Sequence, residues 1–388
     1  MSLVIIGTGL AGYHVAKEFR KLDAVTPILL ITQDDGSFYS KPMLSNAWAK
    51  QKAPAQLVMQ SAEVMTQQLN AKILTHTSVE AINPKTKQVI TSQGAYVYSQ
   101  LVLACGASPI IPTFEGAEHL LQVNSLADYA IFRERLAQLK AQLNRPVKIF
   151  IIGAGLIGCE FANDLASAEI SVHLLDLADQ CMPRLLPQSM AGIMQQQLTD
   201  YGVQFHLGEQ VCSVRNESAE YIIECESGAH FTADIILSAI GLKPNAQLAQ
   251  QANLTIQQGI VVDEYLKTSA DSIYALGDCA QVQGHWLCYV MPLMASARAL
   301  AKTLASELTP VNYPPMPVMV KTPACPLTVC SPPVGCVGSW SVTGAELNWQ
   351  GLFYDAEHKL RGFALLGETT QAEKIKLVQQ LPHLFTLQ

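Results

Sequence analysis

The chain has few charged residues and no basic run. Asp, Glu, Lys and Arg make up 15% of its 388 residues, and the formal net charge is −7 at pH 7. A general nucleic-acid binder needs a basic face to neutralise phosphates, so this composition argues against a nucleic-acid partner.

Motifs of several enzyme classes are also missing. The sequence has no G-x-S-x-G elbow, no Walker loop and no H-E-x-x-H pair, and its nine histidines are scattered without ligand spacing. We therefore expect neither a metal site nor a nucleophilic triad.

The ten cysteines are irregularly spaced, without a C-x-x-C pair, and none precedes Cys105. This pattern is typical of reduced intracellular thiols rather than a disulfide framework. The chain enters an apolar run at residues 3–6 without a basic leader or cleavage site, which predicts a cytoplasmic protein. The most apolar stretch, residues 286–305, contains Arg298 and Lys302 and predicts a buried helix, so we expect no membrane insertion.

Two glycine-rich motifs are present, GTGLAG at residues 7–12 and GAGLIG at residues 153–158. Each follows an apolar run, at residues 3–6 and 147–152. In such a motif the first glycine allows a tight strand-to-helix turn, the second lets the backbone approach a pyrophosphate, and the third lets the helix pack closely on the strand. The pyrophosphate then lies at a helix N-terminus, which favours negative charge. Two dinucleotide sites in one chain indicate electron relay.

The hydrophobic pattern around both motifs predicts the same strand–helix–strand unit. The expected elements are residues 3–6, 12–22 and 28–31 in the first copy, and residues 148–152, 156–168 and 171–176 in the second. This repeat predicts an α/β protein with two Rossmann-like dinucleotide-binding domains.

Proline-containing stretches after the expected strands 101–104 and 235–240 are interpreted as crossings between domains. A third, proline-rich segment follows, with strands expected at 347–354 and 360–366 and a helix at 372–380. We therefore predict a small α+β C-terminal domain beside the two dinucleotide domains. The predicted boundaries are residues 1–110 with 243–315 for a discontinuous first domain, 111–242 for the inserted domain, and 316–388 for the third.

In the second unit Asp176 lies 21 residues after Gly155, at the end of an expected strand. A carboxylate there accepts hydrogen bonds from an adenosine ribose and repels a 2′-phosphate, which favours NADH over NADPH. Arg184 is the nearest cation, and we expect it to be too far along the chain to bind that phosphate.

In the first unit the acidic residue lies further along the chain than the position that corresponds to Asp176. Thr32 occupies the corresponding position, and Asp34 and Asp35 follow it. Either carboxylate could bind the ribose across a longer turn, or the Thr32 hydroxyl could do so, and the sequence leaves these alternatives open.

Further motifs resemble the two-dinucleotide flavoproteins, whose architecture is glutathione-reductase-like. YALGD at 274–278 is similar to their YAxGD signature, LACG at 103–106 to their ATG junction with Cys105 in place of Thr, and AIGLKPN at 239–245 to their GxxPN junction. The resemblance implies that Asp278 hydrogen-bonds the ribityl chain of FAD and that Glu160 lies near the nicotinamide and flavin. The alternatives are a helix cap for Asp278 and a helix-surface carboxylate for Glu160.

Three narrower stretches, residues 39–45, 289–294 and 320–326, resemble the rubredoxin reductases of bacterial alkane-oxidising systems. The resemblance implies an enzyme in which NADH reduces FAD and the flavin passes single electrons to rubredoxin, a one-iron carrier that feeds an alkane hydroxylase. Rubredoxins are usually acidic, so a local basic patch must offset the net charge; Lys41, Lys50, Lys52, Lys302 and Lys321 are candidates. We expect a small, transient docking interface.

Disulfide reductases of this architecture carry a redox cysteine pair in the first FAD segment, where this chain has no cysteine. Cys325 and Cys330 have the C-x₄-C spacing of such a pair, but in the third segment, and we predict a packing role for them. Two other functions stay open: a ferredoxin reductase of an oxygenase or cytochrome P450 chain, and a redox-sensing protein that holds FAD and NADH.

The candidate site residues follow from these motifs. Lys41, as a cation near flavin N1/N5 or else a plain surface lysine, and Glu160 are the catalytic candidates. The candidates for FAD are Gly7, Gly9, Leu10, Ala11, Gly12, Asp34, Lys41, Pro42, Ala104, Asp278 and Val290. The candidates for NAD are Gly153, Gly155, Leu156, Ile157, Gly158, Glu160, Asp176 and Gly241.

Overall fold

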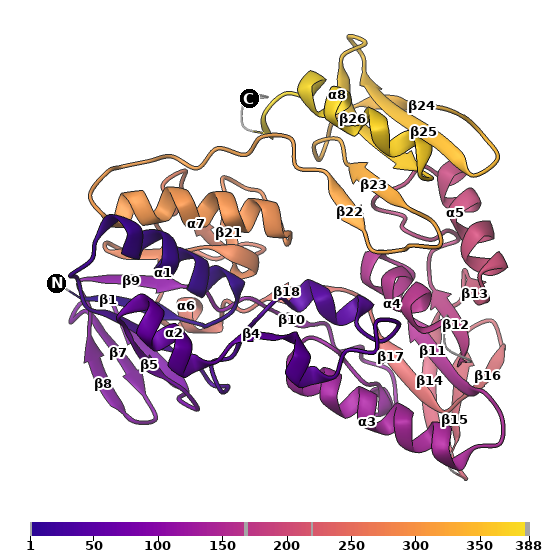
Figure 1. Ribbon diagram of the computed structural model, residues 1–388, viewed down its shortest axis with the longest axis horizontal. Helices are drawn as coiled ribbons and strands as arrows, with labels where there is room; N and C mark the ends of the chain where they lie inside the picture. Colours follow the sequence, from indigo (N-terminus) through magenta and orange to yellow (C-terminus); the bar gives the residue numbers. More distant parts are fainter. Residues whose placement is uncertain (1, 167–169, 219, 385–388) are drawn as a thin grey trace. The chain divides into compact units, whose positions relative to one another are not determined.

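A computed structural model describes residues 2–166, 170–218 and 220–384 (Figure 1). By contact the chain divides into two compact units. Unit 1 comprises Met1–Ser40, Ala55–Ser108 and Leu242–Pro314, and unit 2 comprises Lys41–Pro54, Pro109–Gly241 and Pro315–Gln388.

Unit 1 is built on a parallel five-stranded sheet in the order β20-β9-β1-β2-β5. Its strands are β1 (Leu3–Ile6), β2 (Ile28–Ile31), β5 (Lys72–Leu74), β9 (Gln100–Leu103) and β20 (Ile273–Ala275). All four residues of the central strand β1 are buried, as expected for a parallel sheet covered on both faces. Helices α1 (Leu10–Leu22) and α7 (Val290–Leu304) pack against each other and lie side by side in Figure 1.

Smaller elements complete unit 1. The other strands are β3 (Phe38–Tyr39) with β4 (Val58–Gln60), β6 (Val79–Asn83) with β7 (Gln88–Thr91) and β8 (Gly94–Val97), and β19 (Ile260–Val262) with β21 (Ala280–Val282). The helices are α2 (Ala62–Leu69) and α6 (Gln247–Gln251), with 3-10 turns η2 (Pro54–Leu57) and η4 (Gly277–Cys279). At the chain crossings, β10 (Ala107–Pro109) pairs with β18 (Leu242–Pro244).

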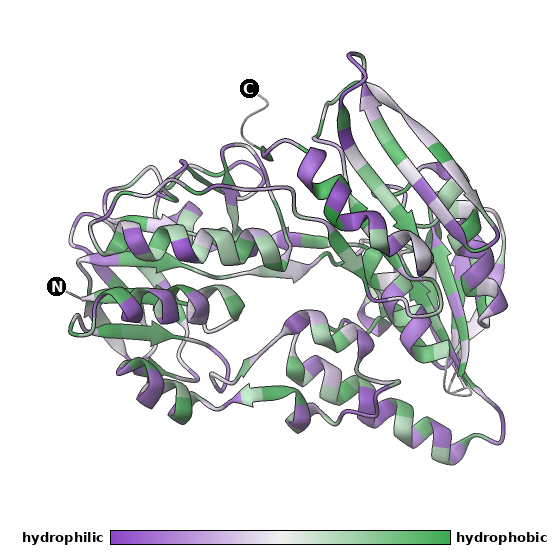
Figure 2. Cartoon of the chain, turned by 45° about the horizontal axis from the view of Figure 1, so that its top comes forward, coloured by the Kyte–Doolittle hydropathy of each residue, from purple (hydrophilic) through white to green (hydrophobic). Residues whose placement is uncertain are grey.

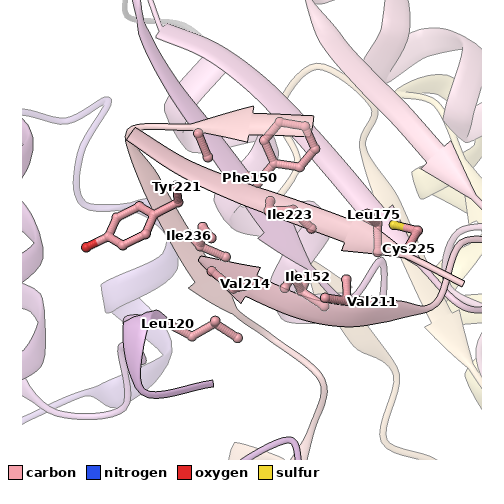
Figure 3. Close-up of a cluster of buried hydrophobic side chains, with 11 residues drawn as sticks. Leu120, Phe150, Ile152, Leu175, Val211, Val214, Tyr221, Ile223, Cys225 and Ile236 are labelled. Carbon is pink, nitrogen blue, oxygen red and sulfur yellow. The ribbon is translucent and has the colours of Figure 1, made fainter. Parts of the chain in front are cut away.

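Unit 2 contains a second parallel sheet in the order β13-β12-β11-β17. Its strands are β11 (Val147–Ile152), β12 (Ile170–Asp176), β13 (Val203–Leu207) and β17 (Ile235–Ser238). An antiparallel ribbon of β14 (Val211–Glu217), β15 (Glu220–Cys225) and β16 (His230–Ala233) contributes side chains to the same core. Figure 3 shows this core, in which Phe150 and Ile152 of β11 and Ile236 of β17 are clustered with Val214 of β14 and Ile223 of β15.

The helices of this part are α3 (Leu126–Gln142), α4 (Leu156–Ala166) and α5 (Gln188–Asp200), with η1 (Lys41–Asn46) and η3 (Ala117–His119). The 3-10 turn η1 contacts α3 and α4, although it comes from the first part of the chain.

The C-terminal part of unit 2 is an antiparallel sheet in the order β22-β23-β26-β25-β24. Its elements are β22 (Val318–Val320), β23 (Leu327–Cys330), β24 (Gly338–Ala345), β25 (Asn348–Asp355), β26 (Leu360–Leu366), η5 (Thr369–Glu373) and α8 (Lys374–Gln380). Leu377 of α8 packs on Phe363 and Leu365, and the inner strand β26 is coloured hydrophobic in Figure 2.

Most predicted elements are present with small shifts at their ends. The helix predicted at 12–22 begins at Leu10, because helical backbone already starts after Gly9. The helix predicted at 372–380 is a 3-10 turn up to Glu373 and α-helical only from Lys374. The helix predicted at 156–168 is α-helical to Ala166, and residues 167–168 lie outside the described residues.

The contact units differ from the three predicted domains in two respects. Residues 41–54, predicted within the first domain, group with unit 2, since η1 packs on α3 and α4. The predicted third domain has its own sheet, but its contacts group it with residues 109–241. One such contact is tight: a Cβ at Gly351 would lie 2.6 Å from Met190 Sδ of α5.

Two expected absences can be examined in the described part of the chain. None of its helices is long and apolar enough to span a bilayer, and the buried helix predicted at 286–305 is α7. In the same residues no three His, Cys, Asp or Glu side chains gather into a group that could hold a metal ion.

Candidate functional site

Both glycine motifs form a strand-to-helix turn that requires glycine at its first position. Gly7 has φ +108° and Gly153 has φ +110°, in the left-handed region. A Cβ at Gly7 would lie 2.3 Å from Ala104 O, and one at Gly153 would lie 2.5 Å from Ala239 O. No larger residue fits either position without moving the backbone.

The second and third glycines of the motifs have different surroundings. A Cβ at Gly12 would lie 1.9 Å from Gly7 O, and one at Gly158 would lie 1.8 Å from Gly153 O, so the helix packs directly on the turn. A Cβ at Gly9 or Gly155 would meet nothing within 4 Å. The second glycine of each motif therefore faces open space beside a helix N-terminus, where backbone N–H groups can bind an anion.

Asp34 is exposed and lies beside the first glycine turn. One oxygen of its carboxylate, Oδ1, accepts hydrogen bonds from Thr32 Oγ1 at 2.6 Å, Gly36 N at 3.0 Å and Thr8 Oγ1 at 3.4 Å. The Thr32 hydroxyl is thus engaged by Asp34. Asp35 instead accepts from the backbone and hydroxyl of Ser37, both at 2.9 Å.

Ala104 and Asp278 lie at the carboxyl ends of the same parallel strands, and Val290 lies at the start of α7. Ala104 follows β9 and its N–H donates to Ile6 O at 2.9 Å. A Cβ at Gly277 would lie 2.9 Å from Ala11 Cβ, which places Asp278 next to the start of α1. Val290 is the first residue of α7 and is 41% exposed. Carboxyl ends of strands flanking the central strand are where open α/β sheets bind ligands.

Asp176 is the last residue of β12 and braces the second glycine turn. Its carboxylate accepts hydrogen bonds from Ala154 N at 2.5 Å and from Ala178 N at 2.8 Å. Gly241, after β17, has φ +122° and accepts a hydrogen bond from Ile110 N at 3.0 Å.

The loop after β12 returns to this turn, which the sequence did not indicate. Met182 N donates to Ala154 O at 2.8 Å. Arg184 is exposed and stands two residues beyond that contact, so it is closer to the turn than its distance along the chain suggests.

Glu160 is a residue of α4 and lies where the third segment packs against this helix. Only 1% of its surface is exposed. Its carboxylate accepts hydrogen bonds from Ser45 Oγ at 2.6 Å and Lys321 N at 3.0 Å, and it forms an ion pair with Lys321 Nζ. The alternative of a helix-surface carboxylate is therefore wrong.

Asp164, one helical turn after Glu160, is also buried, at 4% exposure. It accepts backbone hydrogen bonds from Trp48 N at 2.8 Å and Ala49 N at 3.0 Å, and burial raises the pKa of its carboxyl. The Arg133 guanidinium of α3 stacks over the Trp48 ring at 4.9 Å. These contacts fix residues 41–54 to unit 2.

Lys41 and Pro42 consequently lie in unit 2 with Glu160, and the other FAD candidates lie in unit 1. The Lys41 side chain is exposed, and it is Lys321 that pairs with Glu160. From the sequence, Lys321 is predicted only as a docking residue, and Ser45 and Asp164 are not predicted as site residues. The sequence gives little indication of their role, because each is a single polar residue within a largely apolar stretch.

All ten cysteines are free thiols. Burial raises the pKa of Cys325 to about 12 and that of Cys330 to about 11, so both stay protonated near neutral pH. Cys105 and Cys279 form a hydrogen bond, which together with burial raises the pKa of Cys105. A thiolate is the reactive form, so Cys105, Cys325 and Cys330 have the character of packing residues.

Comparison with known proteins identifies the family. The description "Pyridine nucleotide-disulphide oxidoreductase" matches residues 1–299. This chain belongs to that family. A second description, "Rubredoxin binding C-terminal domain", matches residues 310–381 of this oxidoreductase.

The oxidoreductase is similar to curated proteins along its whole length. It is 45% identical to the rubredoxin-NAD(+) reductase of Alcanivorax borkumensis, with 98% of each chain covered. It is 38% identical to the nitric oxide reductase FlRd-NAD(+) reductase of Aeromonas hydrophila, with 98% of this chain and 96% of the other covered.

A solved structure has the same fold. The covalent putidaredoxin reductase–putidaredoxin complex matches with a TM-score of 0.87 and 26% identity, covering 98% of this chain and 94% of that one. Family membership implies a flavin and a pyridine nucleotide as cofactors, and the fold agrees with two Rossmann-like domains plus a C-terminal part.

Proposed function

We propose that this oxidoreductase uses NADH to reduce bound FAD and passes the electrons singly to rubredoxin. One observation supports rubredoxin as the electron acceptor: the C-terminal segment, residues 310–381, matches a rubredoxin-binding domain. The full-length similarity to a rubredoxin-NAD(+) reductase supports it.

FAD is assigned to the first glycine turn. The open space at Gly9 suits a pyrophosphate, and the turn is completed by Gly7, Leu10, Ala11 and Gly12. Asp34 is our choice for the adenosine ribose, because it lies against Thr8 of that turn and the hydrogen bonds that it accepts from the chain go to Oδ1. In Asp35, by contrast, both carboxylate oxygens accept from Ser37. Ala104 and Asp278 lie at the same edge of the sheet, and with Val290 at the start of α7 they would hold the remainder of the cofactor.

NADH is assigned to the second turn, formed by Gly153, Gly155, Leu156, Ile157 and Gly158, with Gly241 beside it. The Asp176 carboxylate keeps lone pairs for the ribose hydroxyls while it holds Ala154 N. Its charge disfavours a 2′-phosphate, so NADH is preferred over NADPH.

The flavin supplies the hard chemistry, because it accepts two electrons as a hydride and releases them one at a time. The protein contributes position and charge. Glu160 would orient the nicotinamide, and Lys321 and Ser45 hold its carboxylate in one place. Lys41 and Pro42 remain our candidates for contacts with the flavin ring.

No thiol relay is proposed. Of the two cysteines with a suggestive spacing, Cys325 is buried and Cys330 is partly buried, and both thiols are protonated and free. Electrons therefore leave directly for the carrier, in a small and transient encounter. Among the predicted docking lysines, Lys302 is paired with Glu307 in unit 1, whereas Lys41, Lys50, Lys52 and Lys321 belong to unit 2.

The test is anaerobic. The flavoprotein is reduced with NADH and mixed with rubredoxin or with a [2Fe–2S] ferredoxin, and flavin reoxidation is followed by absorbance. We expect fast reoxidation by rubredoxin and slower turnover as salt screens the charges. Faster reoxidation by ferredoxin would reassign the acceptor, and inertness toward both carriers would favour a redox sensor.

A further inference from the structure

A row of polar side chains on α4 holds two segments from distant parts of the chain. Glu160 binds Ser45 and Lys321, Asn163 Oδ1 accepts a hydrogen bond from Ala324 N at 3.0 Å, and Asp164 binds residues 48 and 49. These three α4 side chains are at least 95% buried. Buried polar groups of this kind are costly unless they are hydrogen-bonded, so their contacts strongly specify how α4 and the two segments fit together.

Within this row, Asp164 is the side chain that binds the backbone of residues 41–54. Its two oxygens each accept one backbone N–H, from Trp48 and Ala49, in the turn that follows η1. The same turn is closed by Lys52 N donating to Ala47 O at 3.0 Å. The Arg133 guanidinium donates to Lys52 O at 2.8 Å and covers the Trp48 ring.

Ser45 lies in η1, three residues before this turn, and is 3% exposed. Its hydroxyl reaches Glu160 only if η1 stays in place against α4. Glu160 and Asp164 are four residues apart on α4, so they face the same segment from adjacent turns of the helix. The position of the Ser45 hydroxyl thus depends on the backbone bonds that Asp164 makes.

We propose that Asp164 is a positioning residue for hydride transfer: by holding Trp48 and Ala49 it keeps the Ser45 hydroxyl on Glu160. This inference rests on the proposed function, in which Glu160 orients the nicotinamide. Asp164 itself touches neither cofactor in this scheme. Its loss displaces a hydrogen-bond donor of Glu160, and small displacements at a reacting centre reduce rates by up to about a hundredfold.

The experiment compares the holoenzyme with Asp164→Ala and Asp164→Asn. The observed rate constant of flavin reduction at saturating NADH is measured by anaerobic stopped flow, without any acceptor protein. We expect a fall of about tenfold or more for Asp164→Ala. Asp164→Asn keeps one carbonyl acceptor, so it should recover part of the rate, and it serves if the alanine variant does not fold.

The matched control is Asp234→Asn in the same unit. Asp234 is 3% exposed and accepts a backbone hydrogen bond from Lys148 N at 2.8 Å, but it binds none of residues 41–54. We expect this variant to lose stability and keep the wild-type rate of flavin reduction. An equal fall in rate for the control would overturn the proposal, because it would reflect general loosening of the unit.

Hydrogen exchange supplies a readout that needs no turnover. The Trp48 and Ala49 amides should exchange faster in both Asp164 variants than in wild type. Faster exchange with an unchanged reduction rate would contradict a positioning role. Ser45→Ala should slow flavin reduction in the same way. The double variant Ser45→Ala/Asp164→Ala should be no slower than the slower single variant, since both substitutions remove the same connection to Glu160. Additive losses in the double variant would also contradict the proposal.

The outcome is separable from that of the proposed function. The reduction step involves NADH alone, so a wild type that reduces ferredoxin but not rubredoxin would change the acceptor and leave this inference standing. A wild-type flavin that NADH does not reduce would refute the proposed function, while the exchange measurement would still test the hold of Asp164 on the turn.

Discussion

Lys321 and Glu160 form an ion pair inside unit 2 although 161 positions separate them in the chain. The carboxylate is buried and the lysine is 26% exposed, so the pair neutralises a charge that would otherwise lie in the interior. The pair joins the helix that follows the second glycine turn to the segment that matches a rubredoxin-binding domain.

Removing the lysine should therefore affect both stability and reduction. In Lys321→Met the buried carboxylate loses its partner, which destabilises by about 3 kcal/mol, and flavin reduction by NADH should slow about tenfold. Lys41→Met changes an exposed charge and should shift stability by less than about 0.5 kcal/mol. Thermal unfolding and stopped flow measure both. A wild-type rate of flavin reduction in Lys321→Met would contradict the role of this ion pair.

Coenzyme preference should depend on Asp176. In Asp176→Ser the negative charge at the end of β12 is gone, so the ratio of kcat/KM for NADH to that for NADPH should fall at least about tenfold, roughly 1.4 kcal/mol. Steady-state kinetics with both coenzymes give the ratio. Asp179→Ser is the control, since Asp179 is exposed and should leave the ratio unchanged. An unaltered ratio in Asp176→Ser would show that Asp176 does not set the coenzyme preference, and Arg184 would be the next residue to examine.

Substitutions of two glycines in the second motif should have different effects, one on NADH binding and the other on stability. A Cβ at Gly155 meets nothing, so Gly155→Ala should keep the wild-type melting temperature and weaken NADH binding by filling space meant for the pyrophosphate. A Cβ at Gly158 would lie 1.8 Å from Gly153 O, so Gly158→Ala should destabilise unit 2 by more than about 2 kcal/mol. Calorimetry and NADH titration separate the effects. The same loss of stability in both variants would refute the assigned roles.

The cysteine pair of the third segment should be dispensable for electron flow. Replacing Cys325 and Cys330 by Ser should leave NADH-to-acceptor turnover within about twofold of wild type, because neither thiol is ionised near neutral pH. Stability should fall, since Cys325 is fully buried and a hydroxyl there must find a partner. A hundredfold loss of turnover with FAD retained would show that the pair takes part in catalysis.

Acid should loosen unit 2 through a pair of histidines. His173 Nδ1 and His206 Nε2 lie 3.0 Å apart, and the Phe150 ring stacks on His173 at 4.4 Å. Burial lowers the pKa of His173 to about 4 and also lowers that of His206. The unfolded chain, with a pKa near 6.5, then binds protons first, so stability is constant above pH 6.5 and falls as the pH drops toward 4. The His173 contribution is at most about 3 kcal/mol, and less because the ring is only half-buried.

Urea unfolding at pH 7.5, 6.5 and 5.0 measures this effect. The double variant His173→Gln/His206→Gln removes both titrating rings and should lose most of the slope between pH 6.5 and 5.0. An unchanged slope would assign the acid sensitivity to other groups.

The sequence by itself determined the two glycine turns and the strands before them, because these features are local. A glycine that only a left-handed turn accepts, an apolar run of four to six residues and a carboxylate 21 positions later all lie within one strand–helix–strand unit. Asp176 is found at the end of β12, next to the turn that its spacing indicated. The strands of the third segment followed from the same kind of short-range pattern.

Only the tertiary structure decided which distant residues meet. Glu160 was expected from its motif, but its partners Ser45 and Lys321 come from either side of it in the chain, and no periodicity relates them. Asp164 looked like any polar residue of a helix until residues 41–54 were found packed on α4. Local patterns say which face of a helix is buried; which segment covers that face depends on the packing of the whole unit, and it is this packing that assembles the charged group around Glu160.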